Sequence, residues 1–415
     1  MSRLTNKLSG GILGLLLVMI TLVSCTPILG KPTYYVGVGI VMAIVIVANL
    51  FAKCYQRNIL LVLSVYSYIA LIFVYRFLGI SDAEWGNYVH QLYFFVAILI
   101  MLLMHNKLSY RQKRWVLWLM IGVMIFNIGD NIRLAILYPN INVATRITFD
   151  ESILNNINMG GNSFYTFSLM FFNVCFFIFL NCQRKAIKYV MLCCAILTGV
   201  YICGYCFKAT VVLYFIFSVI LLYYAKKVKN ISRTIIIGGI LGVFLLIFIN
   251  IFSSSLIEFI KEVSPNKRLT ERFITLIDSN DVEANEKTVS GRTTLYMLSI
   301  KTWLANPCNF FFGIGDHRLA HGAASTGIGQ HSDLLDSLAR YGIIGLIILC
   351  VIFKKSFDFI LSLFEQRYRP QLIVFFFILL LCGGTKGIFF PSMGCTFFLL
   401  LPLASVYVNQ QNSLG

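Results

Sequence analysis

Charge is scarce in this sequence, and acidic charge is scarcest. Only 12% of the 415 residues are Asp, Glu, Lys or Arg, whereas about a quarter is usual for a soluble domain. Proline is also rare, with 8 residues, and long apolar runs stand in place of the short alternating segments typical of a membrane β-barrel. The sequence therefore predicts an all-α fold, that of a polytopic integral membrane protein.

Signatures of several other protein classes are missing. No P-loop sequence is found, no internal repeat favours an inverted-repeat transporter, and no A-x-A-like cleavage site follows the first apolar run. The run from Gly11 is therefore interpreted as a retained span. The 12 cysteines lie mostly within apolar runs, so no disulfide framework is indicated, and membrane packing is favoured over a redox or metal role for the Cys203–Cys206 pair.

Basic residues are plentiful, and their distribution predicts topology. A net charge of +17 would suggest a nucleic-acid partner in a soluble protein, but here Lys and Arg gather in every second connection between apolar segments, so no nucleic acid is expected. By the positive-inside rule these connections and both termini are predicted to be cytoplasmic. About twelve spans are predicted, near residues 11–29, 34–53, 58–79, 88–105, 115–137, 162–181, 187–206, 208–224, 234–253, 336–354, 371–388 and 391–408.

The longest polar stretch, residues 254–335, lies on the predicted outer side. It carries eight basic and nine acidic residues and is therefore nearly neutral, unlike a disordered charged tail. We expect a folded periplasmic loop domain here. Spans 1–9 would then occupy residues 1–253, and spans 10–12 with a cytoplasmic tail would occupy residues 336–415.

An arginine stands at the start of a predicted helix in this stretch. Ser290-Gly291-Arg292 precedes the run 293–304, whose alternation of apolar and polar residues suits an interfacial helix that ends at Asn306-Pro307. Free helix N–H groups and a guanidinium fork both favour a phosphate or pyrophosphate. Arg292 is therefore a candidate anion-binding residue, with a surface arginine in a loop as the alternative.

Three of the five histidines follow in the same stretch. His317 and His321 have the spacing of a metal pair only if their segment is helical, which the neighbouring glycines disfavour, so no metal is predicted. His331 lies beside Asp333 where the chain re-enters the membrane, and an imidazole can remove a proton from a hydroxyl near neutral pH. The glycines of Gly313-Ile314-Gly315 would let the backbone approach a bulky ligand.

One further cation lies between two apolar spans. Lys208, in Cys206-Phe207-Lys208-Ala209-Thr210, is near membrane depth, where a charge is costly and usually has a partner. Snorkelling of the ammonium to the outer interface is the alternative.

These motifs resemble those of the O-antigen polymerase and O-antigen ligase superfamily. The segment from Gly291-Arg292 through Pro307 to Gly313-Ile314-Gly315 is similar to the family's arginine-led segment. His331-Ser332 is followed after nine residues by Gly342 and Gly345, which is similar to the family's histidine motif. Phe207–Thr210 is similar to the family's Thr-Arg-Ala segment, with Lys208 where an arginine is usual. The resemblance implies a GT-C-like enzyme of the bacterial inner membrane with one large outer loop.

The chemistry that the resemblance implies is an inverting, metal-independent glycosyl transfer without a cofactor. Donor and acceptor would be undecaprenyl-pyrophosphate-linked glycans in the bilayer, and a chain-length regulator and a flippase are candidate protein partners. Arg292 and Lys208 would hold the donor's pyrophosphate. Because a lysine lacks the bidentate fork, Arg268 or Arg272 is expected to assist Lys208.

His331 would accept the proton of the acceptor sugar's hydroxyl, and Asp333 would orient the imidazole. The run Leu338-Ala339-Arg340-Tyr341-Gly342 looks more like the polymerase branch, so an O-antigen polymerase is favoured. An O-antigen ligase is the alternative within the same chemistry. A membrane transporter or flippase is the alternative from another class, and it would place polar residues at mid-span.

Overall fold

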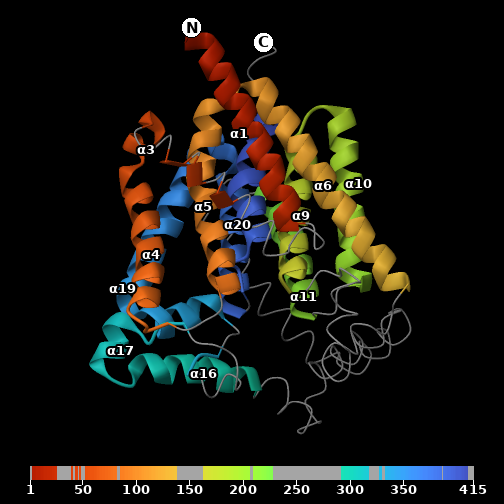
Figure 1. Ribbon diagram of the computed structural model, residues 1–415. Helices are drawn as coiled ribbons and strands as arrows, with labels where there is room; N and C mark the ends of the chain where they lie inside the picture. Colours follow the sequence, from red (N-terminus) through yellow and green to blue (C-terminus); the bar gives the residue numbers. More distant parts are fainter. Residues whose placement is uncertain are drawn as a thin grey trace, which may run out of the picture. The chain divides into compact units, whose positions relative to one another are not determined.

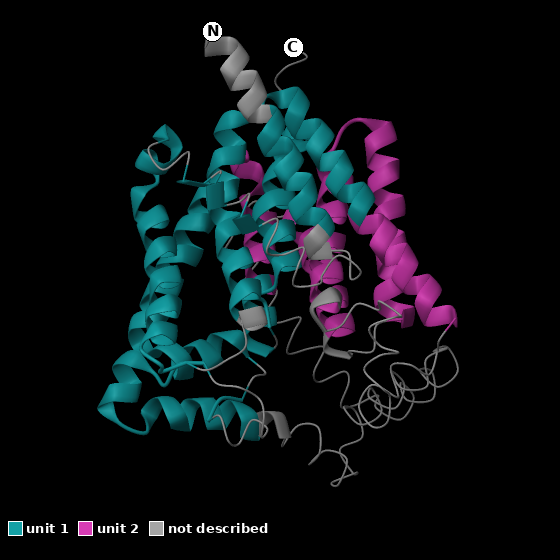
Figure 2. Cartoon of the chain, viewed as in Figure 1, with its two compact units in different colours: residues 1–123, 292–363, 379–410 teal, residues 124–291, 364–378, 411–415 magenta. Residues whose placement is uncertain are grey.

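The computed structural model describes residues 2–25, 39–40, 43–44, 46–47, 52–81, 85–137, 162–205, 209–227, 291–316, 327–329, 332–385 and 387–409. Every regular element within these ranges is a helix, as Figure 1 shows, which confirms the all-α prediction. The chain divides into two compact units (Figure 2). Unit 1 comprises residues 1–123, 292–363 and 379–410, and unit 2 comprises residues 124–291, 364–378 and 411–415.

Unit 1 is built from segments that are far apart in the sequence. Its elements are α1 (Ser2–Cys25), α3 (Lys53–Arg57), α4 (Ile59–Phe77), α5 (Trp85–Lys107), the first half of α6 (Tyr110–Leu137), α16 (Gly291–Leu304), α17 (Pro307–Phe312), α19 (Asp333–Ser362), the end of α20 (Arg369–Thr385), α21 (Pro391–Gly394), the π-helix η5 (Cys395–Leu400) and α22 (Leu401–Val408). Unit 2 contains the second half of α6, α9 (Asn162–Asn181), α10 (Lys185–Val200), the π-helix η2 (Tyr201–Tyr205), α11 (Ala209–Lys227), the 3-10 helix η4 (Gln366–Tyr368) and the first part of α20.

Six segments of the described chain are long and apolar enough to cross a membrane: Ile59–Phe77, Tyr88–Lys107, Tyr110–Leu137, Lys185–Tyr205, Gln366–Thr385 and Pro391–Val408. Shorter apolar helices cover Gly11–Leu22 and Tyr165–Asn181. All of them coincide with predicted spans, as expected for a polytopic membrane protein. The predicted spans near 34–53 and 234–253 lie largely or wholly outside the described residues, so the count of twelve stays a prediction.

Helix α19 differs from the span predicted at 336–354. It runs from Asp333 to Ser362 and is interrupted at Gly342, whose φ of 61° and ψ of −163° are not helical. Residues before Gly342 therefore form a separate short helix at the start of the long one. The described parts of the predicted loop domain, including α16 and α17, belong to unit 1. The boundaries predicted at 253/254 and 335/336 stay predictions.

Aromatic packing holds α19 against the last span within unit 1. The ring of Phe94 on α5 lies 5.3 Å from the rings of Phe389 and Phe398 and 6.3 Å from that of Phe353 on α19. Such buried ring pairs contribute beyond the area that they bury. This cluster packs the connection between α20 and α21, together with η5, against α5.

Polar contacts join the helices of unit 2. The side chain of Asn181 donates a hydrogen bond to Gln371 Oε1 at 3.0 Å, and Gln371 donates in turn to the carbonyl of Leu222 at 3.3 Å. The ring of Phe177 packs edge-on against that of Phe375 at 5.7 Å. Amide contacts of this kind tie membrane helices together, because apolar side chains gain little by leaving lipid.

Contacts at the two ends of unit 1 join segments that are distant in the sequence. At one end, Ser81 contacts Asp316, and Asp333 contacts the connection between α20 and α21. At the other, Arg114 donates to the hydroxyl of Tyr407 at 3.2 Å. The assignment of the Lys/Arg-rich side and the termini to the cytoplasm stays a prediction.

Candidate functional site

Helices α16 and α17 form an elbow that lies across the end of α4 (Figure 1). Helix α16 confirms the helix predicted over residues 293–304, and it begins two residues earlier, at Gly291. Asn306 caps α17, because its Oδ1 accepts from the backbone N–H of Asn309 at 2.8 Å and Pro307 follows at the first helical position. Trp303 stacks on Phe310 at 5.0 Å and donates to its carbonyl at 3.0 Å, which closes the elbow.

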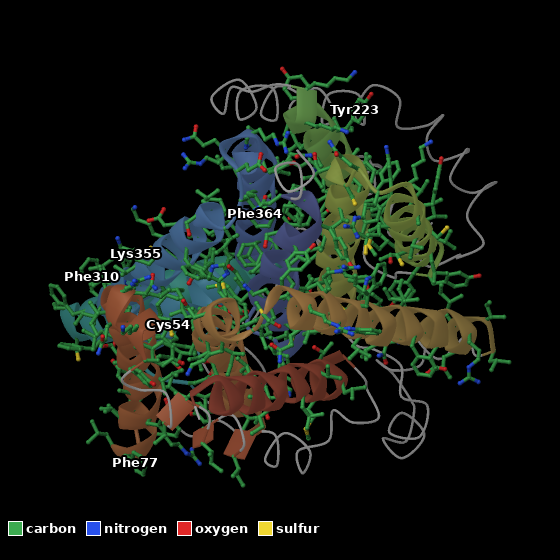
Figure 3. All side chains as sticks on the ribbon, turned by 90° about the horizontal axis from the view of Figure 1, so that it is seen from above. Cys54, Phe77, Tyr223, Phe310, Lys355 and Phe364 are labelled. Atoms are coloured by element: carbon green, nitrogen blue, oxygen red, sulfur yellow. The ribbon has the colours of Figure 1, made fainter. Side chains whose placement is uncertain are left out.

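The outer edge of this elbow is apolar. Phe311 and Phe312 of α17 are exposed, as are Phe77 and Leu78 where α4 ends. Phe77 and Phe310 both lie at the periphery of unit 1 in the end-on view (Figure 3). The hydroxyl of Tyr75 donates to the carbonyl of Phe312, so the end of α4 and the elbow are in direct contact.

The Gly-x-Gly segment binds to the backbone of α19. The N–H groups of Ile314 and Gly315 donate to the carbonyls of Ala339 and Arg340, each at 2.9 Å. These carbonyls lack helical partners because the helix breaks at Gly342, so the segment satisfies the acceptors that the kink leaves open. The arginine-led and histidine motifs therefore meet backbone to backbone.

The glycines of both motifs serve this close approach. A Cβ at Gly313 would lie 2.4 Å from the carbonyl carbon of Arg340, and one at Gly342 would lie 2.3 Å from the carbonyl oxygen of Phe311. The expectation that the glycines of residues 313–315 make room for a ligand is therefore wrong, because another part of the chain occupies that space.

A buried ion pair fixes the other end of the Gly-x-Gly segment. Asp316 and Arg340 are 3% and 8% exposed, and Arg340 Nε lies 3.1 Å from Asp316 Oδ1. The N–H of Asp316 donates to Ser81 Oγ at 2.7 Å. Removal of one partner would leave a buried charge uncompensated, which is costly. The sequence offered one signal for this pair, an arginine at the start of an otherwise apolar segment.

A second buried polar group joins α16 to the start of α19. Ser299 and Asp336 are 0% and 2% exposed, and the hydroxyl of Ser299 donates to Asp336 Oδ1 at 2.7 Å. The same hydroxyl oxygen accepts from the N–H of Gly329 at 2.9 Å. The N–H of Ser332 donates to Asp336 Oδ2 at 3.3 Å, while the Oγ of Ser332 caps the helix by accepting from Leu335 at 3.2 Å. Sequence reasoning missed Ser299 and Asp336 as a pair.

Asp333 holds the connection between α20 and α21. Its Oδ2 accepts from the backbone N–H groups of Ile388 and of Phe389, the latter at 2.8 Å, and the neighbouring Ser332 donates to the carbonyl of Gly383 at 3.2 Å. Burial at the N-terminal end of α19 raises the pKa of Asp333 to about 6, although the hydrogen bond from Phe389 and the charge of Arg340 oppose the rise. The predicted role of Asp333 in orienting His331 stays a prediction.

The other predicted site residues are placed as follows. Arg292 is the second residue of α16, seven positions before Ser299, and this spacing of about two turns puts both on one face of the helix. The remaining four, His331, Lys208, Arg268 and Arg272, lie outside the described residues. Their roles in base catalysis and pyrophosphate binding stay predictions.

Comparison with known proteins identifies one part of the chain. No curated protein matches the sequence. Residues 191–350 match the model of the family described as O-antigen ligase. The matched region runs from α10 into α19 and includes both motifs that meet at Gly313 and Gly342. Over residues 191–350, the chain is thus similar to the O-antigen ligase family, and the match places a domain of that family on this segment.

Proposed function

We propose that the protein is an O-antigen polymerase, a metal-independent inverting glycosyltransferase that joins undecaprenyl-pyrophosphate-linked oligosaccharide units at the periplasmic face of a bacterial inner membrane. One observation carries the proposal: the two motifs that resemble the family's arginine and histidine segments form one buried cluster, through the hydrogen bonds of Ile314 with Ala339 and of Gly315 with Arg340. This cluster lies within the region that matches the family.

The reaction joins an acceptor hydroxyl to the anomeric carbon of the donor glycan. His331 accepts the hydroxyl proton as the oxygen attacks, and Asp333 orients the imidazole. The bond between the anomeric carbon and the pyrophosphate oxygen breaks, and undecaprenyl pyrophosphate leaves with the bonding electrons. Arg292 and Lys208 stabilise the charge on this leaving group. A single displacement inverts the anomeric configuration.

Additional cations support the pyrophosphate site in this proposal. Because Lys208 supplies a point charge without a bidentate fork, Arg268 or Arg272 completes the binding of the phosphate oxygens. The position of Arg292 in the first turn of α16 favours an anion there, since the N-terminal N–H groups of a helix have no helical acceptor.

The preference for a polymerase rests on the run Leu338–Gly342, which looks like the polymerase branch. In the structure this run supplies both carbonyls to which the Gly-x-Gly segment binds. An O-antigen ligase, which transfers a finished polymer to lipid A core, is the second candidate, because the matched family is described by that name.

Deletion of the gene separates the candidates through the lipopolysaccharide that the strain makes. A polymerase deletion is expected to leave core bearing a single repeat unit. Bare core, with long polymer accumulating on the polyprenyl carrier, would show that the protein is the ligase. Bare core with lipid-linked single units retained on the cytoplasmic face would favour a flippase. Restoration of the parental banding by a plasmid-borne gene controls for effects on neighbouring genes.

A further inference from the structure

Gly329 and Ser332 flank Gln330 and His331, and both are hydrogen-bonded to the same pair of side chains. On one side, the N–H of Gly329 donates to Ser299 Oγ at 2.9 Å. On the other, the N–H of Ser332 donates to Asp336 Oδ2 at 3.3 Å. Ser299 and Asp336 are hydrogen-bonded to each other at 2.7 Å, so one buried group holds both ends of this short segment.

Close packing adds to these hydrogen bonds on the Gly329 side. A Cβ at Gly329 would lie 2.1 Å from the carbonyl oxygen of Leu295, so the backbone there lies directly against α16, one turn before Ser299. On the Ser332 side, the hydroxyl of Ser332 donates to the carbonyl of Gly383 at 3.2 Å.

The buried setting makes the Ser299–Asp336 bond strong and its loss costly. A hydrogen bond to a carboxylate is shorter and stronger than one between neutral groups, and both side chains here are almost fully shielded from water. Without the hydroxyl of Ser299, the N–H of Gly329 and one oxygen of Asp336 would both lose a buried partner. The pair therefore resists separation of α16 from the start of α19.

We propose that Ser299 and Asp336 are positioning residues that fix the segment carrying His331 against α16, the helix that carries Arg292. The proposal rests on the proposed function, in which Arg292 binds the pyrophosphate and His331 accepts the proton. Neither Ser299 nor Asp336 touches substrate. Their effect is to hold the base and the anion site at a constant separation, because Arg292 and Ser299 share one face of the same rigid helix.

The test compares Ser299→Ala and Asp336→Asn with two matched controls. Ser299→Thr keeps the hydroxyl, and Asp358→Asn removes an exposed carboxylate elsewhere on α19. Each variant is made in the full-length chain in which the exposed cysteines Cys193, Cys203, Cys308 and Cys350 are replaced by serine and Gln330 is replaced by cysteine. The first readout is the rate at which a membrane-impermeant maleimide modifies Cys at position 330 in sealed spheroplasts.

Ser299→Ala and Asp336→Asn are expected to raise this modification rate about fivefold, the factor that corresponds to one lost hydrogen bond in a local opening equilibrium. Ser299→Thr and Asp358→Asn are expected to leave it unchanged. Asp336→Asn is nearly isosteric and keeps one acceptor, so it provides a mild second variant beside Ser299→Ala. Unchanged rates in both variants, at normal protein levels, would overturn the proposal.

The second readout is polymer formation from the lipid-linked repeat unit that a deletion strain accumulates. Ser299→Ala and Asp336→Asn are expected to lower kcat on the order of 10- to 100-fold with little change in KM, because a displaced base weakens the transition state and leaves substrate binding intact. A rise in KM with unchanged kcat would contradict the positioning role. If the protein with its natural sequence forms no polymer, the proposed function is wrong. The modification rates still decide whether Ser299 and Asp336 hold the segment.

Discussion

At the residue scale, substitution of His331 is the most direct test of the proposed chemistry. We expect His331→Ala to abolish polymer formation while the protein accumulates normally in the membrane, since loss of a general base costs about 10²–10⁴ in rate. The measurement is the distribution of polymer lengths in a deletion strain that carries the variant, normalised to the amount of protein in the membrane. Parental chain lengths at normal expression would show that His331 is not the base.

The anion site makes a separate prediction at this scale. Arg292→Ala is expected to be inactive. Lys208→Arg is expected to be tolerated and Lys208→Ala to be inactive, because the pyrophosphate requires a cation and an arginine restores the fork that the family motif usually supplies. The same polymer assay measures all three variants. An active Lys208→Ala protein would mean that Lys208 only snorkels to the interface.

At the scale of elements, the kink in α19 depends on one glycine. Gly342 has φ +61°, a conformation that other residues rarely adopt, and a Cβ there would lie 2.3 Å from the carbonyl of Phe311. We expect Gly342→Ala to disrupt the contact between α17 and α19 and to lower the amount of folded protein in the membrane. A left-handed conformation alone costs an alanine about 1 kcal/mol or more.

Gly384→Ala is the matched control, because no atom lies within 4 Å of a Cβ at that position and its backbone carries no positive φ. It is expected to be neutral or slightly stabilising in the same helix-rich surroundings. Thermal aggregation of the detergent-purified proteins, followed by fluorescence-detected size exclusion, compares the two variants. Equal stability of Gly342→Ala and the parent would show that the kink does not need this glycine.

At the scale of the whole molecule, the charge pattern predicts the sidedness of the chain. Both termini and the Lys/Arg-rich turns are expected in the cytoplasm, and residues 254–335 outside. Alkaline phosphatase fused at Asn280 should therefore be active, while a fusion at Lys227 should be inactive. The opposite pair of activities would reverse the entire topology.

The sequence predicted the helices well because each depends on a local pattern. Windows of about 20 apolar residues mark the spans, and Asn306-Pro307 marks the end of α16. It did not predict the contacts that assemble the site. Ser299 and Asp336 are 37 residues apart, and Ser81 and Asp316 are 235 apart. No periodicity within one element indicates which distant element will satisfy a buried polar group.

The distance along the chain between Ser81 and Asp316 has a consequence for biosynthesis. Helices enter the membrane in the order of synthesis, so more than half of the protein is made before Asp316 and the α17 elbow reach the C-terminal end of α4. Unit 1 is discontinuous, and it closes only when its last segment, residues 379–410, arrives. Until then Tyr75 and Ser81 lack the partners that Phe312 and Asp316 supply, and nascent chains stalled before α16 are expected to be substrates for membrane quality-control proteases.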